Sequence, residues 1–136
     1  MLKNSLPKEE RIYLRNEINK LFSSRDSFVC YPFRVLYLWV PYQEGYPSKV
    51  LVSVPKKKLK HAVDRNRIKR LLKEAYRQNK HALQESIEQM EDKRTLLIAF
   101  IYLPEKVSKY SKVLKATIEA LESLRQTIES SSAPCS

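Results

Sequence analysis

The chain has 136 residues, enough for one domain with a real hydrophobic core, and a net charge of +11. Its hydrophobic fraction of 43% and charged fraction of 30% are those of an ordinary globular protein, which excludes global disorder. Residues 56–80 hold 11 Lys or Arg and 2 Asp or Glu, so +9 of the total +11 lies in this segment. Such a concentration of positive charge is typical of a surface that binds a polyanion.

The sequence lacks the motifs on which several classes of function depend. With Gly45 as the only glycine, a phosphate-cradling loop cannot be built, and no nucleophile elbow or zinc-protease motif is present. Cys30 and Cys135 have no metal-ligand spacing, which favours two free thiols in a reducing cytosol. The N-terminus has no apolar signal region, and the longest apolar run, 96–103, is too short to span a bilayer. We therefore expect a cytoplasmic protein that binds no membrane and no metal or cofactor of its own.

The first half of the chain predicts one helix and two strands. Apolar residues at helical spacing predict a helix over roughly residues 15–24. Residues 33–42, FRVLYLWVPY, are β-branched and aromatic and predict a strand, with a possible extra strand around 28–31. A turn at Gly45 and Pro47 leads to a second predicted strand, residues 49–54, which we expect to pair with the first.

In the second half the hydrophobic period changes to 3.6 from about Ala62. One buried helix face is predicted by Ile68, Leu71, Leu72, Ala75 and Tyr76. Apolar residues at 83–90 either extend this helix or form a second one, and the continuous apolar run 95–103 predicts a central strand. A final helix, capped by Ser108 or Ser111, follows.

This order of elements predicts an α+β fold, a single two-layer α/β sandwich. We expect a mixed sheet of about four strands, an N-terminal helix, a basic helix between two strands and a C-terminal helix. The domain would cover residues 1–128, with 1–8 flexible and 129–136 a disordered tail.

On a helical wheel the basic helix has a cationic face beside its apolar face. Asp64 and Glu74 are the only acids in this segment, whereas a solvated structural helix normally alternates charges of opposite sign. A merely solvated face and a membrane-surface helix remain alternatives, but nucleic acid fits best because Arg and Lys bind phosphate. The predicted RNA-binding residues are Lys56, Lys57, Lys58, Arg65, Asn66, Arg67, Lys69, Arg70, Lys73 and Arg77.

Aromatic residues are crowded into the first third of the chain. Phe33, Tyr37 and Trp39 alternate onto one face of the predicted strand 33–42. Such residues are either core or a stacking platform for unpaired bases. Together with the cationic helix they favour RNA over DNA.

The segment AVDRNRIKRLLKEAYR at 62–77, preceded by SVPKK at 53–57, resembles the signature of the bacterial ribonuclease P protein component. In that family a strand ends in Lys-Lys, and a connector leads to a helix with Arg-Asn-Arg-x-Lys-Arg. The resemblance covers roughly residues 9–128. The segment 81–94 looks longer than in typical members.

The resemblance implies a left-handed β-α-β crossover and a subunit of an endoribonuclease that removes the 5′ leader from precursor tRNA. The RNA subunit would perform the Mg²⁺-dependent hydrolysis, so this chain would carry no catalytic residue. Its partners would be ribonuclease P RNA and precursor tRNA, with no protein partner evident. An aromatic cleft for the leader would contain Phe22, Phe33 and Tyr37, whereas Ile18 stands where many members have another aromatic and Leu51 where many have Gly.

Two other functions remain open. A ribosomal or other structural RNA-binding protein without a catalytic role fits the same cationic helix. A duplex-DNA binder is disfavoured because the helix also carries a core face of its own domain.

Overall fold

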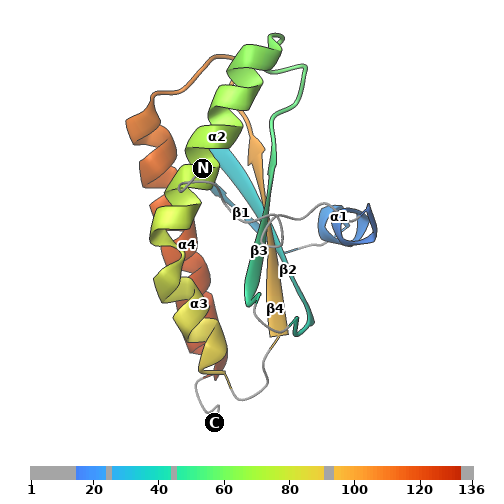
Figure 1. Ribbon diagram of the computed structural model, residues 1–136, viewed down its shortest axis with the longest axis vertical. Coiled ribbons are helices and arrows are strands. Elements are labelled where there is room, and N and C mark those ends of the chain that lie inside the picture. Colours follow the sequence, from blue (N-terminus) through green and yellow to red (C-terminus); the bar gives the residue numbers. More distant parts are fainter. Residues whose placement is uncertain (1–14, 24–25, 44–45, 91–93, 133–136) are drawn as a thin grey trace, which may run out of the picture.

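The structure, a computed structural model, describes residues 15–23, 26–43, 46–90 and 94–132 (Figure 1). Its elements in chain order are α1 (Arg15–Phe22), β1 (Ser27–Cys30), β2 (Phe33–Pro41), β3 (Ser48–Ser53), α2 (Ala62–Asn79), α3 (His81–Glu88), β4 (Arg94–Tyr102) and α4 (Tyr110–Ser132). The predicted α+β class is confirmed, and so is the extra strand, which is β1. The apolar residues after α2 form the separate helix α3.

The four strands form one mixed sheet in the order β1-β2-β4-β3. β2 is antiparallel to both β1 and β4, whereas β3 runs parallel to β4, and α2 and α3 form the crossover between them. The predicted pairing of β2 with β3 is therefore wrong, because β4 lies between them. Every residue from Thr95 to Phe100 in β4 is buried, and a strand covered on both faces is most stable at the centre of the sheet. The handedness of the crossover stays a prediction.

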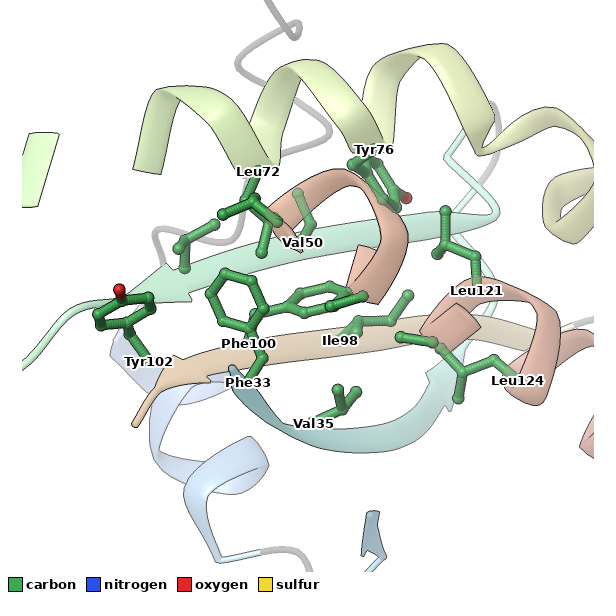
Figure 2. Packing of buried hydrophobic residues seen from close by; sticks show 14 of the residues in the cluster. Phe33, Val35, Val50, Leu72, Tyr76, Ile98, Phe100, Tyr102, Leu121 and Leu124 are labelled. Carbon is green, nitrogen blue, oxygen red and sulfur yellow. The ribbon is translucent and has the colours of Figure 1, made fainter. Parts of the chain in front are cut away.

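The main hydrophobic core lies between one face of the sheet and α2, α3 and α4 (Figures 1 and 2). Leu72 descends from α2 and Leu124 comes from α4, and both are essentially inaccessible to solvent. In the sheet, the rings of Phe33 and Phe100 meet edge to face with centroids 5.7 Å apart. This geometry is favourable for aromatic pairs and fixes β2 against β4.

Helix α1 covers part of the opposite face of the sheet (Figure 1). Leu21 has no exposed surface and forms a second, smaller cluster with Leu36, Leu97 and Ala99. Ile18 and Leu51 pack against the same cluster. The sheet is thus apolar on both faces, and α1 lies across it from the other helices.

Polar contacts tie α3 to the start of β3 and the end of β2. The Ser48 hydroxyl is hydrogen-bonded to the Tyr76 hydroxyl and accepts a hydrogen bond from Gln84 Nε2 at 3.0 Å. The Tyr42 hydroxyl donates to Glu88 Oε1 at 2.9 Å. The long segment after α2 therefore has a structural role, because it extends the helical layer and holds this end of the sheet.

The ends of the chain depart from the predicted boundaries where they can be compared. The predicted cap by Ser108 or Ser111 is wrong, because Ser111 lies inside α4 and the Ser108 hydroxyl is hydrogen-bonded to the Tyr102 hydroxyl at 2.8 Å. α4 continues to Ser132, past the predicted boundary at 128. Residues 1–8 and 133–136 lie outside the described residues. Among the helices that the structure describes, none combines the length and apolarity needed to cross a membrane.

Candidate nucleic-acid interface

Helix α2 carries the cationic surface on a rigidly anchored element. Ile68, Leu72 and Tyr76 have no exposed surface and join the main core, as the 3.6 period predicts. The strand β3 precedes this helix and β4 follows α3, so both ends of the crossover are fixed in the sheet. A helix held in this way presents its remaining side chains in a constant orientation.

The predicted cationic face of α2 is accessible to solvent in the structure. Asn66, Arg67 and Arg70 are exposed, and Lys69 and Lys73 are half-buried along the helix. Half-buried lysines are normal here, since their apolar stems cover the neighbouring surface while the ammonium groups reach water. The exposed positions lie within two turns, which gives a phosphate backbone several cations at close spacing.

The connector between β3 and α2 brings three further lysines to the amino end of the helix. Val54 and Leu59 are buried and anchor the connector, and backbone N–H groups of residues 58 and 59 bond the Pro55 carbonyl. Lys56 and Lys57 are exposed on this turn, and Lys58 is half-buried. The lysines at the strand end and the cations of α2 are therefore parts of one region.

Arg65 has a structural role that the sequence did not indicate. Its Nη1 donates hydrogen bonds to the carbonyl oxygens of Leu59 and Lys60, both at 2.8 Å. These bonds tie the connector to the first turn of α2, and they occupy a side chain predicted to contact RNA. Arg65 reaches these carbonyl oxygens because of the way the connector folds back on the helix. No local sequence pattern predicts that fold.

Arg77 is also engaged within the protein. Its guanidinium donates to both carboxylate oxygens of Glu74, at 3.1 and 2.8 Å. Hydrogen bonding to Arg77 lowers the pKa of Glu74, and the same bond raises the pKa of Arg77. Both side chains remain about a quarter exposed, so the pair is a surface pair with modest consequences for stability.

The structure does not bring the three predicted cleft aromatics together. Phe33 is completely buried and Tyr37 packs against the main core, on the face covered by α2, α3 and α4. Phe22 lies on α1, across the sheet, and is 45% exposed. A single cleft lined by all three is therefore wrong, because Phe33 has no surface on which a base could stack. Of the three, Phe22 offers the open ring.

A groove beside α1 is a better candidate for an extended ligand. It has a volume of about 540 Å³ and runs between α1 and the second half of β2. Its lining residues are Asn19, Lys20, Ser23, Leu38, Trp39, Val40 and Pro41. The sequence analysis did not predict this groove.

The described residues contain no group of three or more His, Cys, Asp or Glu side chains that is arranged to hold a metal ion. What the described surface offers is cations, hydrogen-bond donors and an open aromatic ring. Groups of this kind are suited to binding an anionic polymer.

Comparisons with known proteins identify the family of this chain. The family model described as "Ribonuclease P" matches residues 6–124. The "Ribonuclease P protein component" of one strain of Porphyromonas gingivalis is 40% identical over 126 residues, covering 93% of this chain and 90% of that protein. The protein of the same name from Chlorobaculum tepidum is 33% identical over 104 residues, covering 73% and 68% of the two chains.

Two solved structures share the fold. The RNase P protein from Thermotoga maritima has a TM-score of 0.62 at 21% identity, with 84% of this chain and 96% of that chain covered. The Staphylococcus aureus RNase P protein has a TM-score of 0.57 at 18% identity, with 88% and 97% covered. With the family model and the relatives, these matches confirm the resemblance carried by residues 53–77: the chain belongs to the ribonuclease P protein component family.

Proposed function

We propose that this chain is the protein subunit of a ribonuclease P and binds the RNA subunit through α2 and the connector before it. The observation that carries the proposal is the division of α2 into two faces. Ile68 and Leu72 are inaccessible in the core, whereas Arg67 and Arg70 point their charges to solvent. The charges of Arg67 and Arg70 therefore lie outside the core, and an RNA backbone would relieve their mutual repulsion.

The RNA contact would be mainly electrostatic. Arg67 and Arg70 supply planar donors suited to two phosphate oxygens, and Lys56, Lys57 and Lys69 supply point charges. About six phosphate contacts would give a slope of log affinity against log salt near −4 to −5. Arg65 would act chiefly by holding the connector lysines beside the helix.

The 5′ leader of precursor tRNA would lie on the other face of the sheet, in the groove beside α1. Lys20 at that groove offers a charge for phosphate, and the exposed ring of Phe22 on the same helix offers a stacking surface. The β2 side of this groove is apolar and is formed by Leu38, Trp39, Val40 and Pro41. An apolar side of this kind would support contacts that do not depend on leader sequence.

Hydrolysis would be performed by the RNA subunit with Mg²⁺, in the cytoplasm, and this chain would hold and orient the RNAs. No residue of the chain is assigned a chemical step. The role of the protein would be to raise the affinity for precursor tRNA and to lower the Mg²⁺ concentration that the holoenzyme needs.

A binding measurement tests the proposal. Purified protein should bind ribonuclease P RNA with the steep salt dependence given above, and bind a ribosomal RNA fragment of equal length much more weakly. Replacing Arg67 and Arg70 by Ala should reduce the slope by about 2 units. Equal affinity for both RNAs would favour the structural RNA-binding alternative and contradict the proposal.

A further inference from the structure

A second group of lysines occupies the first half of α4, outside the surface described above. Lys109 immediately precedes the helix, and Lys112 and Lys115 follow at intervals of three residues; all three are exposed. At 3.6 residues per turn they lie within about one third of the helix circumference and span about 9 Å along its axis. They form one cationic stripe.

This stripe is unfavourable for the helix that carries it. Positive side chains at the amino end of a helix oppose its dipole, and the first turn of α4 contains no acidic residue. Lysines three residues apart also repel each other. Among the described residues, no side-chain hydrogen bond or ion pair engages these three lysines. Glu119, one turn after Lys115, is the first acid along the helix. An external anion would remove this repulsion.

The stripe begins just after a loop that faces the proposed RNA surface across a groove. A groove of about 590 Å³ separates the connector and the start of α2 from the loop before α4. Lys57, Lys58 and Lys60 line one side of it and Lys106 the other, together with the acids Asp64 and Glu105. Lys106, three residues before Lys109, therefore lies across this groove from the connector lysines.

The lysine stripe lies on the side of α4 that faces the β1 edge of the sheet, away from α2. Ser123 and Gln126 lie eleven residues, about three turns, after Lys112 and Lys115, so they share the same side of α4. Both line a groove between α4 and β1, the edge strand farthest from β3. α2 packs over β3 at the other edge. The cations of α2 and the lysine stripe of α4 thus lie at opposite edges of the helical layer.

We propose that Lys109, Lys112 and Lys115 form a second contact with the backbone of the RNA subunit, separate from the contact made by α2. The inference rests on the proposed function. The partner is the RNA subunit rather than the leader because α4 lies on the face of the sheet opposite α1 and its groove. A large folded RNA is able to meet both flanks, whereas the leader is one strand on the other face.

The test replaces all three lysines by Gln in the full chain, with the triple Lys→Arg variant as the matched control that keeps the charge. Circular dichroism first establishes that both variants are folded. Loss of three phosphate contacts lowers the salt slope for ribonuclease P RNA by about 2 to 3 units. Affinity at about 0.15 M salt then falls by about 50- to 150-fold, and by little near 1 M. The Arg variant retains the slope of the unaltered protein.

The Arg67→Ala variant serves as the reference for the α2 surface. If that variant loses slope and the Gln variant does not, the second contact is refuted while the proposed function stands. If the Gln variant lowers affinity for precursor tRNA but not for the RNA subunit, the assignment to the RNA subunit is refuted. If the unaltered protein does not bind the RNA subunit at all, the proposed function fails and this inference fails with it.

Discussion

Neighbouring residues on α2 should respond to substitution in opposite ways. Ile68 has no exposed surface, so Ile68→Ala leaves a cavity in the main core and should cost about 2–5 kcal/mol of unfolding free energy. For a chain of this length, that corresponds to a fall in Tm of about 8–20 °C, at about 4 °C per kcal/mol. Arg67 is exposed, and Arg67→Ala should change stability by no more than about 0.5 kcal/mol.

For RNA binding, Arg67→Ala should have the larger effect and Ile68→Ala the smaller one. Arg67→Ala removes one phosphate contact, which lowers the salt slope by about 1 unit and the affinity at about 0.15 M salt by about fivefold. Ile68→Ala should bind RNA almost normally at a temperature where it is still folded. Thermal denaturation by circular dichroism and filter binding of ribonuclease P RNA measure the two effects. An equal loss of Tm for both variants would refute the division of α2 into two faces.

Three further substitutions test other parts of the account. Phe22→Ala should weaken binding of precursor tRNA to the holoenzyme by about 1–3 kcal/mol for each base stacked on the ring, and should leave binding of mature tRNA unchanged. An equal loss for both tRNAs would contradict a leader contact. Arg65→Ala removes two hydrogen bonds to the connector. It should lower the free energy of unfolding, measured with denaturant, by about 1–3 kcal/mol and speed proteolysis between residues 55 and 61. Unchanged stability and proteolysis would show that these bonds do not hold the connector. Burial first, and Glu119 second, raise the pKa of the Cys30 thiol. In a Cys135→Ser background, alkylation of Cys30 should therefore reach its half-maximal rate at a higher pH than a free thiol, and Glu119→Gln should lower that pH only partway. A profile equal to that of a free thiol would show that Cys30 is not buried in solution.

Periodicity alone predicted the parts of the fold that local sequence controls. The apolar positions of α2 repeat over several turns, so both its helix and its buried face follow from the pattern. The apolar run of β4 predicted a central strand because it is continuous, without alternation, so that both of its faces need to be covered. The cationic face of α2 followed by exclusion, because charged side chains are not buried without partners.

The partner of each strand could not be predicted in this way. β2 and β3 are neighbours in sequence, and the turn between them suggested a hairpin, but β4 pairs with both after a crossover of two helices. Nothing in a single strand specifies its partner. Both faces of the sheet are apolar, so the side on which α1 lies was equally open.

The exposure of the predicted site residues followed from the sequence for the charged side chains but not for the aromatic ones. Lysines and arginines remain at the surface in almost any fold, and Arg67 and Arg70 do so here. Aromatic rings serve equally as core or as stacking surface, and the structure buries Phe33 while it exposes Phe22. Arg65 holds the connector through backbone carbonyls, a contact that depends on the path of the chain.

Cleavage of precursor tRNA tests the central claim, that this chain positions RNA for an RNA catalyst, most directly. The rate of 5′ leader removal is measured with ribonuclease P RNA at low Mg²⁺, with the protein, without it, and with the Arg67→Ala/Arg70→Ala variant. The account predicts that the protein raises kcat/KM, that the variant loses most of this gain, and that the protein alone cleaves nothing. Cleavage by the protein without RNA, or no gain over the RNA alone, would contradict it.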